Sequence, residues 1–444
     1  MNNEMECRPF CPAEVNMIKQ ITDQSRIVLL LPSRAVLHYS GLSGIRLTRD
    51  DSNTVLNNLG DMPGPLIVAE ADGQFLGITW EPWSPLIGQT KPGIQIEGDT
   101  WKLIFPAGVT PCVYPAAETL AGAVIPYAQQ HASPAPPGWQ TLKGIKRAVY
   151  LDMWQINGTV LHDYDMACRL LRELDHLDLA KGTLLYLPGW HAPYDTRMPA
   201  WKPADELGGP SGFRQLVDLA KSLGAIIMPH MNFWGYDRES GLLDDWEKAW
   251  SGYRWPGNVG ICPGYPIEYM LVDDPRWICL FDSYFDRTVE SFGLDAVFLD
   301  QCGNAMGHAT HDMAQATRGL LERIHRKYPD LLLGAEVLNE NIVDHVPLIQ
   351  ATWLMEENIG RFSPIAKLMF KDRVRFIPHL FLAAARPCRY VYTNMPLIVE
   401  HGYEQAFAWY QQNNRQLGTI PSVRLDYRRS GIDPCSLDVL KTGD

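Results

Sequence analysis

The sequence predicts an α/β protein in which a (β/α)8 TIM barrel is preceded by a small antiparallel β region. Three observations lead to this prediction. From residue 147 onward, short apolar strands alternate with amphipathic helices, which is the pattern of parallel βαβ units. Before that point, residues 64–108 show strand-turn-strand patterns typical of antiparallel hairpins. A proline-rich stretch at 129–140 separates the two patterns, and we place the domain boundary there.

The first part of the chain, residues 1–140, is predicted to be a β-rich, sandwich-like region that ends in a linker. Apolar runs flank the turn residues Asp72 and Gly73, and the pattern recurs around Gly98 and Asp99. Short strands around such turns form β-hairpins. We therefore expect a small antiparallel sandwich ahead of the barrel.

The second part, residues 141–444, contains about eight units of strand followed by helix, as a (β/α)8 barrel requires. Its continuously apolar strands fit a parallel sheet that is covered on its outer face. A doubly wound Rossmann sheet is the rival fold, but no GxGxxG follows an early strand and no P-loop motif occurs. The predicted strands are 147–154, 182–190, 225–232, 294–301 and 331–336, with weaker ones near 351–356, 388–394 and 419–425, and the predicted helices are 162–174, 212–224, 277–292, 311–328 and 404–414.

The composition argues against several classes of protein. The 444 residues are 46% hydrophobic and 20% charged, as in ordinary globular proteins. A net charge of −12 disfavours binding to the phosphate backbone of nucleic acids. No apolar run approaches the roughly 18 residues of a membrane span, and no secretory signal is evident. Nine scattered cysteines without zinc-type spacing indicate reduced thiols in a cytoplasmic protein.

Polar and aromatic side chains follow the predicted strands where each strand ends. In a TIM barrel, the C-terminal ends of the strands carry the functional site. The residue types found there would supply the hydrogen-bond partners and aromatic surfaces that a carbohydrate needs, and we expect no cofactor and no metal. For the tryptophans, packing in the core is the alternative. The candidate substrate-binding residues are Asp152, Trp154, Trp190, His191, Asp195, His230, Asn232, Trp234, Tyr236, Gln301, Asn339, Arg424 and Asp426.

Two strand ends carry a carboxylate directly after an apolar run. Asp300 follows Ala-Val-Phe-Leu, and Glu336 follows Leu-Leu-Leu-Gly-Ala. Glycoside cleavage uses two carboxyl groups, about 5–5.5 Å apart for retention of configuration and roughly 6.5–9.5 Å apart for inversion. Neighbouring barrel strands would bring two such groups together. The alternative makes Asp300 the N-cap of a helix and Glu336 a solvated loop acid.

The motifs around these carboxylates resemble those of α-glycoside-cleaving barrels. The segment GLDAVFLDQ at 293–301 resembles the strand-four signature of α-glucosidase family 31 and of the α-galactosidase clan, in which the Asp is the nucleophile. GAE at 334–336 resembles the strand-five Glu of α-amylase-like and endo-α-N-acetylgalactosaminidase-like barrels. LPGWHAPYD and the segment 206–225 resemble the second βα unit of the latter group and its uncharacterised relatives, in which the barrel follows a β-sandwich.

This resemblance covers roughly residues 148–340 and implies two catalytic roles. Asp300 matches the nucleophile, and Glu336 matches the acid/base. Family 31 takes its acid from strand six instead, where Glu356 and Glu357 lie. The identity of the acid therefore has two alternatives. The chain departs from the sandwich-barrel pattern in its short N-terminal β region and in the lack of an obvious β domain after the barrel.

Together, these features predict a glycoside hydrolase that cleaves an α-linked sugar by a retaining mechanism and whose partner is a carbohydrate. The first alternative is a catalytically inactive sugar-binding barrel. The second is a metal-dependent barrel hydrolase that uses His230, His308 and His311. A long insertion at about 233–277 is rich in aromatic residues. We expect its first part, 234–237, to contact substrate and the remainder to form a cap. The oligomeric state is left open.

Overall fold

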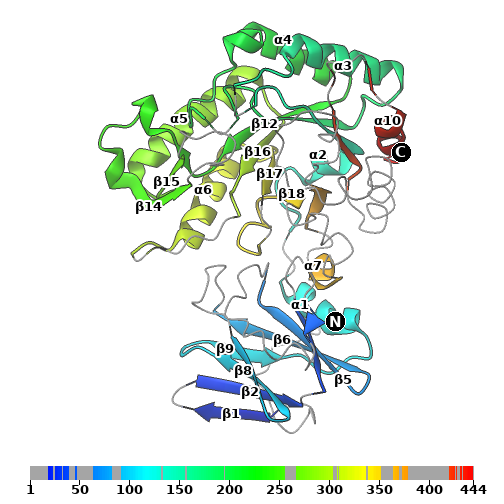
Figure 1. The fold of residues 1–444 in the computed structure, drawn as a ribbon, viewed down its shortest axis with the longest axis vertical. Helices are drawn as coiled ribbons and strands as arrows, with labels where there is room; N and C mark the ends of the chain where they lie inside the picture. The colour runs from blue at the N-terminus through cyan, green and yellow to red at the C-terminus, as the bar shows by residue number, and fades with distance from the viewer. Residues whose placement is uncertain are drawn as a thin grey trace.

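The computed structural model describes most of the chain from residue 19 to residue 443. The described residues are 19–23, 26–32, 34–39, 46–47, 64–82, 92–131, 134–155, 158–194, 196–255, 267–303, 308, 310–336, 339–351, 364–369, 373–378, 420–425, 427, 431–432 and 434–443. Figure 1 shows antiparallel strands at the bottom of the view and the parallel strands with their helices at the top. No helix among these residues is long and apolar enough to cross a membrane.

The N-terminal strands form two antiparallel sheets, as the hairpin patterns predicted. The turn residues Asp72 and Gly73 join β5 to β6, and Gly98 and Asp99 join β7 to β8. Side chains from both sheets, Trp80 and Phe105 among them, share one buried apolar cluster. One sheet has the order β1 (Lys19–Asp23), β2 (Arg26–Pro32), β8 (Thr100–Phe105), β7 (Gly93–Glu97), and the other β4 (Arg46–Leu47), β3 (Val36–Tyr39), β5 (Leu66–Ala71), β6 (Gln74–Glu81), β9 (Thr110–Val113).

The thiols do not all follow the prediction. Cys168 and Cys302 are buried free thiols, and Cys279 is an exposed one. Cys112, on β9 (Thr110–Val113), is disulfide-bonded. The expectation that all the cysteines are reduced is therefore wrong for Cys112.

The second part of the chain is a parallel sheet with helices on its outer face (Figure 1). Every neighbouring pair of strands runs parallel. The strands, in sheet order, are β19 (Arg375–Pro378), β18 (Leu348–Ala351), β17 (Leu332–Glu336), β16 (Ala296–Asp300), β12 (Ile226–Asn232), β11 (Thr183–Leu187), β10 (Arg147–Tyr150) and β20 (Ser422–Arg424). The helices among the described residues that pack on the outer face are α3 (Tyr164–His176), α4 (Gly209–Ser222), α5 (Pro275–Phe292), α6 (Met313–Lys327), α7 (Pro364–Met369) and α10 (Pro434–Lys441). The short helix α2 (Trp139–Gly144) differs, because its Leu142 packs in the cluster inside the curve of the sheet.

The predictions for the later strands were less accurate than those for the earlier ones. Strand β18 overlaps the strand expected near 351–356 only at Ala351, because residues 352–356 lie outside the described residues, and β19 was missed. The strand expected at 388–394 and the helix expected at 404–414 lie outside the described residues. The sheet itself follows from strands that are apolar on both faces, since such strands need cover on each side.

Alternate residues along the strands belong to two different cores. Tyr150, Tyr186 and Phe298 pack together inside the curve of the sheet. Val149, Leu185, Val297 and Leu299 join the larger cluster with the apolar faces of the helices. Because side chains in a strand alternate with a period of two, the inner series continues along the strands toward their C-terminal ends. Its last members, beyond the apolar layer, are Asp152, Asn232, Asp300, Glu336, Gln350 and Arg424.

The insertion after β12 forms a small sheet of its own. Three antiparallel strands have the order β13 (Gly235–Tyr236), β15 (Ile267–Met270) and β14 (Trp250–Trp255). Two short 3-10 turns, Arg238–Ser240 and Trp246–Ala249, lie between β13 and β14. The side chains of Trp234 and Tyr236 are 0% exposed. The apolar side chains of the insertion therefore belong to the same core as the helix side of the parallel sheet.

Helix α1 (Leu120–Gln130) connects the two parts of the chain. Thr119 caps its N-terminus by accepting a hydrogen bond from the backbone N–H of Gly122. Figure 1 places α1 beside α7, between the antiparallel sheets and the parallel sheet, and the two helices are in contact. The Tyr127 hydroxyl on α1 donates to Glu340, which lies in the loop that follows β17. Contacts of this kind join the β-rich part to the part that contains the parallel sheet.

Candidate active site

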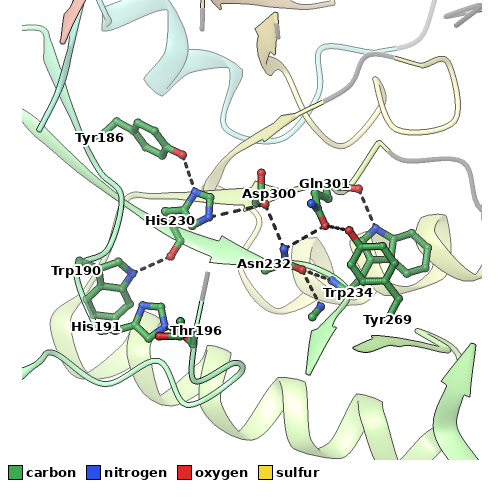
Figure 2. Close-up of polar contacts among 11 residues, drawn as sticks. Tyr186, Trp190, His191, Thr196, His230, Asn232, Trp234, Tyr269, Asp300 and Gln301 are labelled. Carbon is green, nitrogen blue, oxygen red and sulfur yellow. Dashed lines mark hydrogen bonds and ion pairs between the residues drawn. The ribbon is translucent and has the colours of Figure 1, made fainter. Parts of the chain in front are cut away.

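Asp300 is the last residue of β16 and lies near the centre of a buried polar network (Figure 2). Its side chain is 7% exposed. The Asn232 Nδ2 atom donates a hydrogen bond of 3.1 Å to Oδ2 of Asp300. The His230 Nε2 atom lies 3.9 Å from the same oxygen. Strands β12 and β16 pair so that Asn232 stands opposite Asp300. The pairing of the two strands thus sets the position of this carboxylate.

The imidazole of His230 is fixed on several sides. Its Nδ1 atom lies 2.6 Å from the hydroxyl of Tyr186, on the neighbouring strand β11. Its ring stacks on Phe298, with 17° between the planes, and the ring of Tyr194 lies 4.9 Å away, centroid to centroid. The side chain is 2% exposed. His230 is therefore held rigidly beside Asp300.

The amide of Asn232 is oriented by the start of the insertion. Its Oδ1 atom accepts hydrogen bonds from the backbone N–H of Trp234 at 3.0 Å and of Gly235 at 2.7 Å. The amide nitrogen must then face Asp300 and Oε1 of Gln301, which is 3.3 Å away. Gln301 Oε1 also accepts from the hydroxyl of Tyr269, on β15. The backbone at Gln301 has a φ of +59°, an uncommon conformation that recurs at functional sites.

Glu336 ends β17, the strand next to β16. Leu299 pairs with Ala335, so Asp300 and Glu336 are the next residues on the two strands. Neighbouring strands lie about 4.8 Å apart, and both residues belong to the inner series. The backbone N–H of Gly303 donates to the carbonyl of Glu336 at 3.1 Å. The Asn339 Nδ2 atom donates to the carbonyl of Gly303 at 2.7 Å. These bonds tie together the loops that follow the two strands, and they give Asn339 a structural contact.

An ion pair lies at the C-terminal ends of two other strands, β10 and β20. We call the region around the C-terminal ends of the parallel strands the mouth of the sheet. Arg424, on β20, donates from Nε to Oδ2 of Asp152 at 2.6 Å, and its Nη2 contacts the same oxygen. Asp152 follows β10, the strand next to β20. Gln350, on β18, lies 3.4 Å from the Tyr150 hydroxyl at the centre of the sheet. The predicted substrate-binding pair Asp152 and Arg424 is thus brought together at the predicted end of the sheet.

Two further predicted residues present buried polar atoms. Trp154 is 9% exposed and His191 is 6% exposed. The Nε2 atom of His191 lies 3.2 Å from the carbonyl oxygen of Thr196. Neither Trp154 Nε1 nor His191 Nδ1 has a hydrogen-bond partner among the described residues. Burial lowers the pKa of His191 to about 3, and the neighbouring His230 contributes. His191 is therefore neutral at ordinary pH.

Three predicted substrate contacts are corrected by the structure. Trp190, Trp234 and Tyr236 are all 0% exposed and pack in the core. The Trp190 ring stacks on Phe213, and its Nε1 donates to the carbonyl of His230 at 2.8 Å. Trp234 Nε1 donates to the carbonyl of Gln301 at 2.8 Å. These rings support the residues of the site from behind instead of facing a substrate.

Some predicted residues lie outside the described residues, and some residues of the site were not predicted. Asp195, Asp426, Glu356 and Glu357 are not among the described residues. The contacts that Tyr186, Tyr269 and Gln350 make in the site were not predicted. Tyr186 and Gln350 belong to the inner series of their strands, so the period of two could have identified both. Tyr269 comes from the insertion, for which the sequence carries no comparable signal.

The described residues contain no group of three or more His, Cys, Asp or Glu side chains that could hold a metal ion. His311 pairs with Asp273, with its Nδ1 2.9 Å from a carboxylate oxygen. Its ring lies 5.0 Å from that of His308. His230 contacts Tyr186 and Asp300 instead. The three histidines of the metal-dependent alternative therefore have separate partners.

Solved structures with a similar fold are glycosidases that act on α-linked sugars. Ligand-free α-N-acetylgalactosaminidase NagBb from Bifidobacterium bifidum matches with a TM-score of 0.63 at 14% identity, over 96% of this chain and 80% of the other. The α-galactosidase TtGalA from Thermus thermophilus, in complex with stachyose, matches with 0.57 at 12% identity, over 96% and 99%. The GH36 α-galactosidase AgaB from Geobacillus stearothermophilus matches with 0.59 at 11% identity, over 94% and 62%.

The chain shares the fold of these glycosidases. No family model matches the sequence, and no curated protein matches it either. At 11–14% identity the likeness is one of fold alone. The predicted resemblance to α-glycoside-cleaving barrels is confirmed at that level.

Proposed function

We propose that this chain is a glycoside hydrolase that cleaves an α-linked sugar by a retaining double displacement. Asp300 is the nucleophile and Glu336 the acid/base. The observation that carries the proposal is their position. The two residues end the neighbouring strands β16 and β17 at the same level, and both belong to the inner series. A strand spacing of about 4.8 Å suits the separation of about 5–5.5 Å that retaining enzymes use. The fold shared with α-galactosidases and an α-N-acetylgalactosaminidase supports an α-linked substrate.

We also propose that the parallel sheet closes into a (β/α)8 barrel. The strands from β10 to β19 follow one another in the sheet in the order in which they occur in the chain. The last strand, β20, pairs with the first parallel strand, β10. This pairing of last with first is the feature of a closed barrel, in which β19 and β20 would be the remaining neighbours. The C-terminal ends of the strands then surround one pocket.

The two carboxyl groups divide the reaction into two steps. Asp300 attacks the anomeric carbon while the bond to the leaving oxygen breaks, and Glu336 gives that oxygen its proton. Water then attacks the glycosyl-enzyme, Glu336 takes a proton from it, and Asp300 is released. Asn232 holds Asp300 through a hydrogen bond to Oδ2. Since Asn232 Nδ2 is a donor, it favours the ionised form of this carboxylate.

The remaining polar groups of the mouth suit sugar hydroxyls. Trp154 Nε1 is a donor and Nδ1 of the neutral His191 ring is an acceptor, and both atoms are buried without a partner among the described residues. A buried polar group without a hydrogen bond is costly, and a bound hydroxyl would satisfy it. The Asp152–Arg424 pair offers both acceptors and donors on the opposite strands.

The test uses Asp300→Asn and Glu336→Gln on a panel of aryl α- and β-glycosides that includes α-galactosides and α-N-acetylgalactosaminides. Asp295→Asn is the matched control, because Asp295 precedes the same strand at its opposite end and is half-exposed. We expect kcat/KM to fall by about 1,000-fold or more in Asp300→Asn, which is roughly 4 kcal/mol of transition-state stabilisation. The control should match the native protein.

Other outcomes distinguish the alternatives. Glu336→Gln should lose most activity on substrates with poor leaving groups and least on activated ones, because only the former need the proton. The same pattern in Glu356→Gln or Glu357→Gln, with Glu336→Gln unaffected, would transfer the acid to strand six. Binding of glycans without any turnover would favour an inactive sugar-binding barrel. Loss of activity on chelation would favour the metal-dependent hydrolase.

A further inference from the structure

One aromatic side chain of the insertion is exposed beside the buried network. Tyr253, on β14, is 49% exposed. Several large hydrophobic side chains are exposed among the described residues, and Tyr253 is the only aromatic one of these. Its ring stacks on Tyr269, with centroids 5.2 Å apart and 16° between the planes. Tyr269 itself is 2% exposed. The exposed ring of Tyr253 therefore covers the buried ring of Tyr269.

The backbone around Tyr253 holds this ring in place. The pairing of β14 with β15 shifts between Trp250 and Arg254, so the strand bulges at Ser251, Gly252 and Tyr253. Trp250 Nε1 donates to the carbonyl of Tyr253 at 2.9 Å, and the backbone N–H of Tyr253 lies 3.2 Å from Oγ of Ser251. Gly252 has a φ of +80°, which a glycine adopts without strain. Bulges often redirect a side chain next to an active site.

Tyr253 lies on the face of the small sheet that is turned toward Asp300. Consecutive residues of a strand point to opposite faces. Glu268 pairs with Arg254 on one face. Tyr269 lies on the other face, where its hydroxyl donates to Gln301. Gln301 in turn accepts from Asn232, the residue that holds Asp300 (Figure 2). Since Tyr253 stacks on Tyr269, its ring belongs to this same face.

We propose that the ring pair of Tyr253 and Tyr269 is a binding subsite for a sugar ring of the leaving group. The inference rests on the proposed function and narrows the substrate to oligosaccharides or glycan chains. Asp300 and His191 are buried within the mouth, so the glycosyl unit is held inside and the leaving group points outward, toward the exposed insertion. An exposed aromatic ring offers an apolar surface for the C–H face of a sugar.

The test compares two substrates that share one α-linked sugar: its glycosyl fluoride, whose leaving group has no ring, and an oligosaccharide. In Tyr253→Ala, we expect kcat/KM on the oligosaccharide to fall by about tenfold or more, and on the fluoride by less than about threefold. Tyr253→Phe, which keeps the ring, should restore most of the loss. Leu177→Ala is the control, because Leu177 is an exposed apolar residue at the far end of α3.

Each other outcome has a definite meaning. An equal loss on both substrates, or no loss on either, would overturn the subsite. If the native protein hydrolyses neither substrate, calorimetry with the same oligosaccharide decides the matter. Weaker binding in Tyr253→Ala than in Tyr253→Phe would keep the subsite while the hydrolase proposal fails. No binding by the native protein would overturn the subsite as well.

Discussion

The amide group of Asn232 makes two kinds of hydrogen bond, one through its oxygen and one through its nitrogen. Its oxygen accepts from two backbone N–H groups at the start of the insertion, and its nitrogen donates to Asp300 and Gln301. The first role belongs to folding and the second to the chemistry of the nearby carboxylate. A substitution that separates the two roles therefore shows what the donor contributes.

Asn232→Asp is such a substitution. The new carboxylate still accepts from Trp234 and Gly235, so we expect the variant to fold, with a lowered melting temperature because a buried donor is lost and a second buried carboxylate is added. It places an acceptor and a negative charge against Asp300, and like charges oppose ionisation. We expect kcat/KM at neutral pH to fall by about 100-fold, near 2.7 kcal/mol, and the acidic limb of the pH profile to move upward. An unchanged pH profile in a folded variant would count against the role given to Asn232.

Trp234 provides the opposite case, a residue whose contribution is to stability. It is fully buried, and its ring packs edge-on against Phe233. We expect Trp234→Ala to lower the free energy of unfolding by about 3–5 kcal/mol, because a large cavity remains. Trp234→Phe should cost much less, since most of the volume is kept. Urea denaturation measures both, and an unaffected midpoint in Trp234→Ala would contradict the assignment to the core.

The sequence predicted the positions of Asp300 and Glu336 at the ends of their strands better than the contacts around them, for a physical reason. Asp300 and Glu336 each follow a long apolar run, and a charged side chain after such a run must lie where the strand emerges. Tyr269 and Tyr186 are amphipathic, so a tyrosine in an apolar strand looks like a core residue until its hydroxyl partner is known. Trp190 and Trp234 were misassigned for the same reason, because polar tips and apolar bodies fit both roles.

At the scale of elements, helix α6 meets the loop after β17 through two histidines. The Nδ1 atoms of His325 and His345 lie 3.4 Å apart, and the rings stack at 24°. Burial lowers the pKa of His325 to about 3, and it lowers the pKa of His345 as well. A hydrogen bond between these two nitrogens needs one N–H and one lone pair, so at least one of the two rings must be neutral for this contact to form.

This pair makes stability depend on pH. The unfolded chain takes up protons near pH 6.5, whereas the folded chain does not until about pH 3. Stability is therefore complete above pH 6.5 and is lost as the pH falls below it. At pH 5, His325 accounts for about 2 kcal/mol of that loss. Denaturation at pH 7.5 and pH 5 should show a smaller drop for His325→Gln than for the native protein, and the exposed control His176→Gln should not differ from the native protein.

The elements were predictable to different extents. Strands β12 and β16 are long and apolar, with clear helices behind them, and their positions matched closely. Strand β19 begins and ends with Arg375 and Pro378, and its residues do not form an apolar run. The insertion was predicted only as a cap, and its small sheet was not predicted. Its register depends on pairing across a gap in sequence, which local patterns do not encode.

At the scale of the whole molecule, a buried polar cluster joins the β-rich part to the part that contains the parallel sheet. Glu340 accepts from the Tyr127 hydroxyl, and its carboxylate lies 3.5 Å from His131 and 3.8 Å from Arg373. Arg373 also donates to the carbonyl of His131 at 3.2 Å. Burial raises the pKa of Glu340. Because the carboxylate of Glu340 is buried, the stability of the cluster depends on each group that donates a hydrogen bond to it.

Tyr127→Phe removes one of these donors while keeping the ring. We expect it to lower the free energy of unfolding by about 1–3 kcal/mol, because a buried acceptor loses a hydrogen bond. Calorimetry should also show the unfolding of the two parts beginning to separate. Tyr114→Phe is the matched control, since its hydroxyl bonds to Gln130 within the β-rich part. If both variants behave alike, Tyr127 does not couple the two parts.

The alternation of inner and outer residues along the parallel strands also limits how this protein can change. Deleting one residue within β16 would shift the following part of the strand by one position. Asp300 would then point to the face that is covered by helices, and the other side chains after the deletion would also change faces. Evolution can therefore alter the strands by substitution, whereas insertions and deletions are confined to the loops beyond the last inner residue. The 233–277 insertion follows β12 at such a position. New specificity can thus be added there without moving the carboxylates.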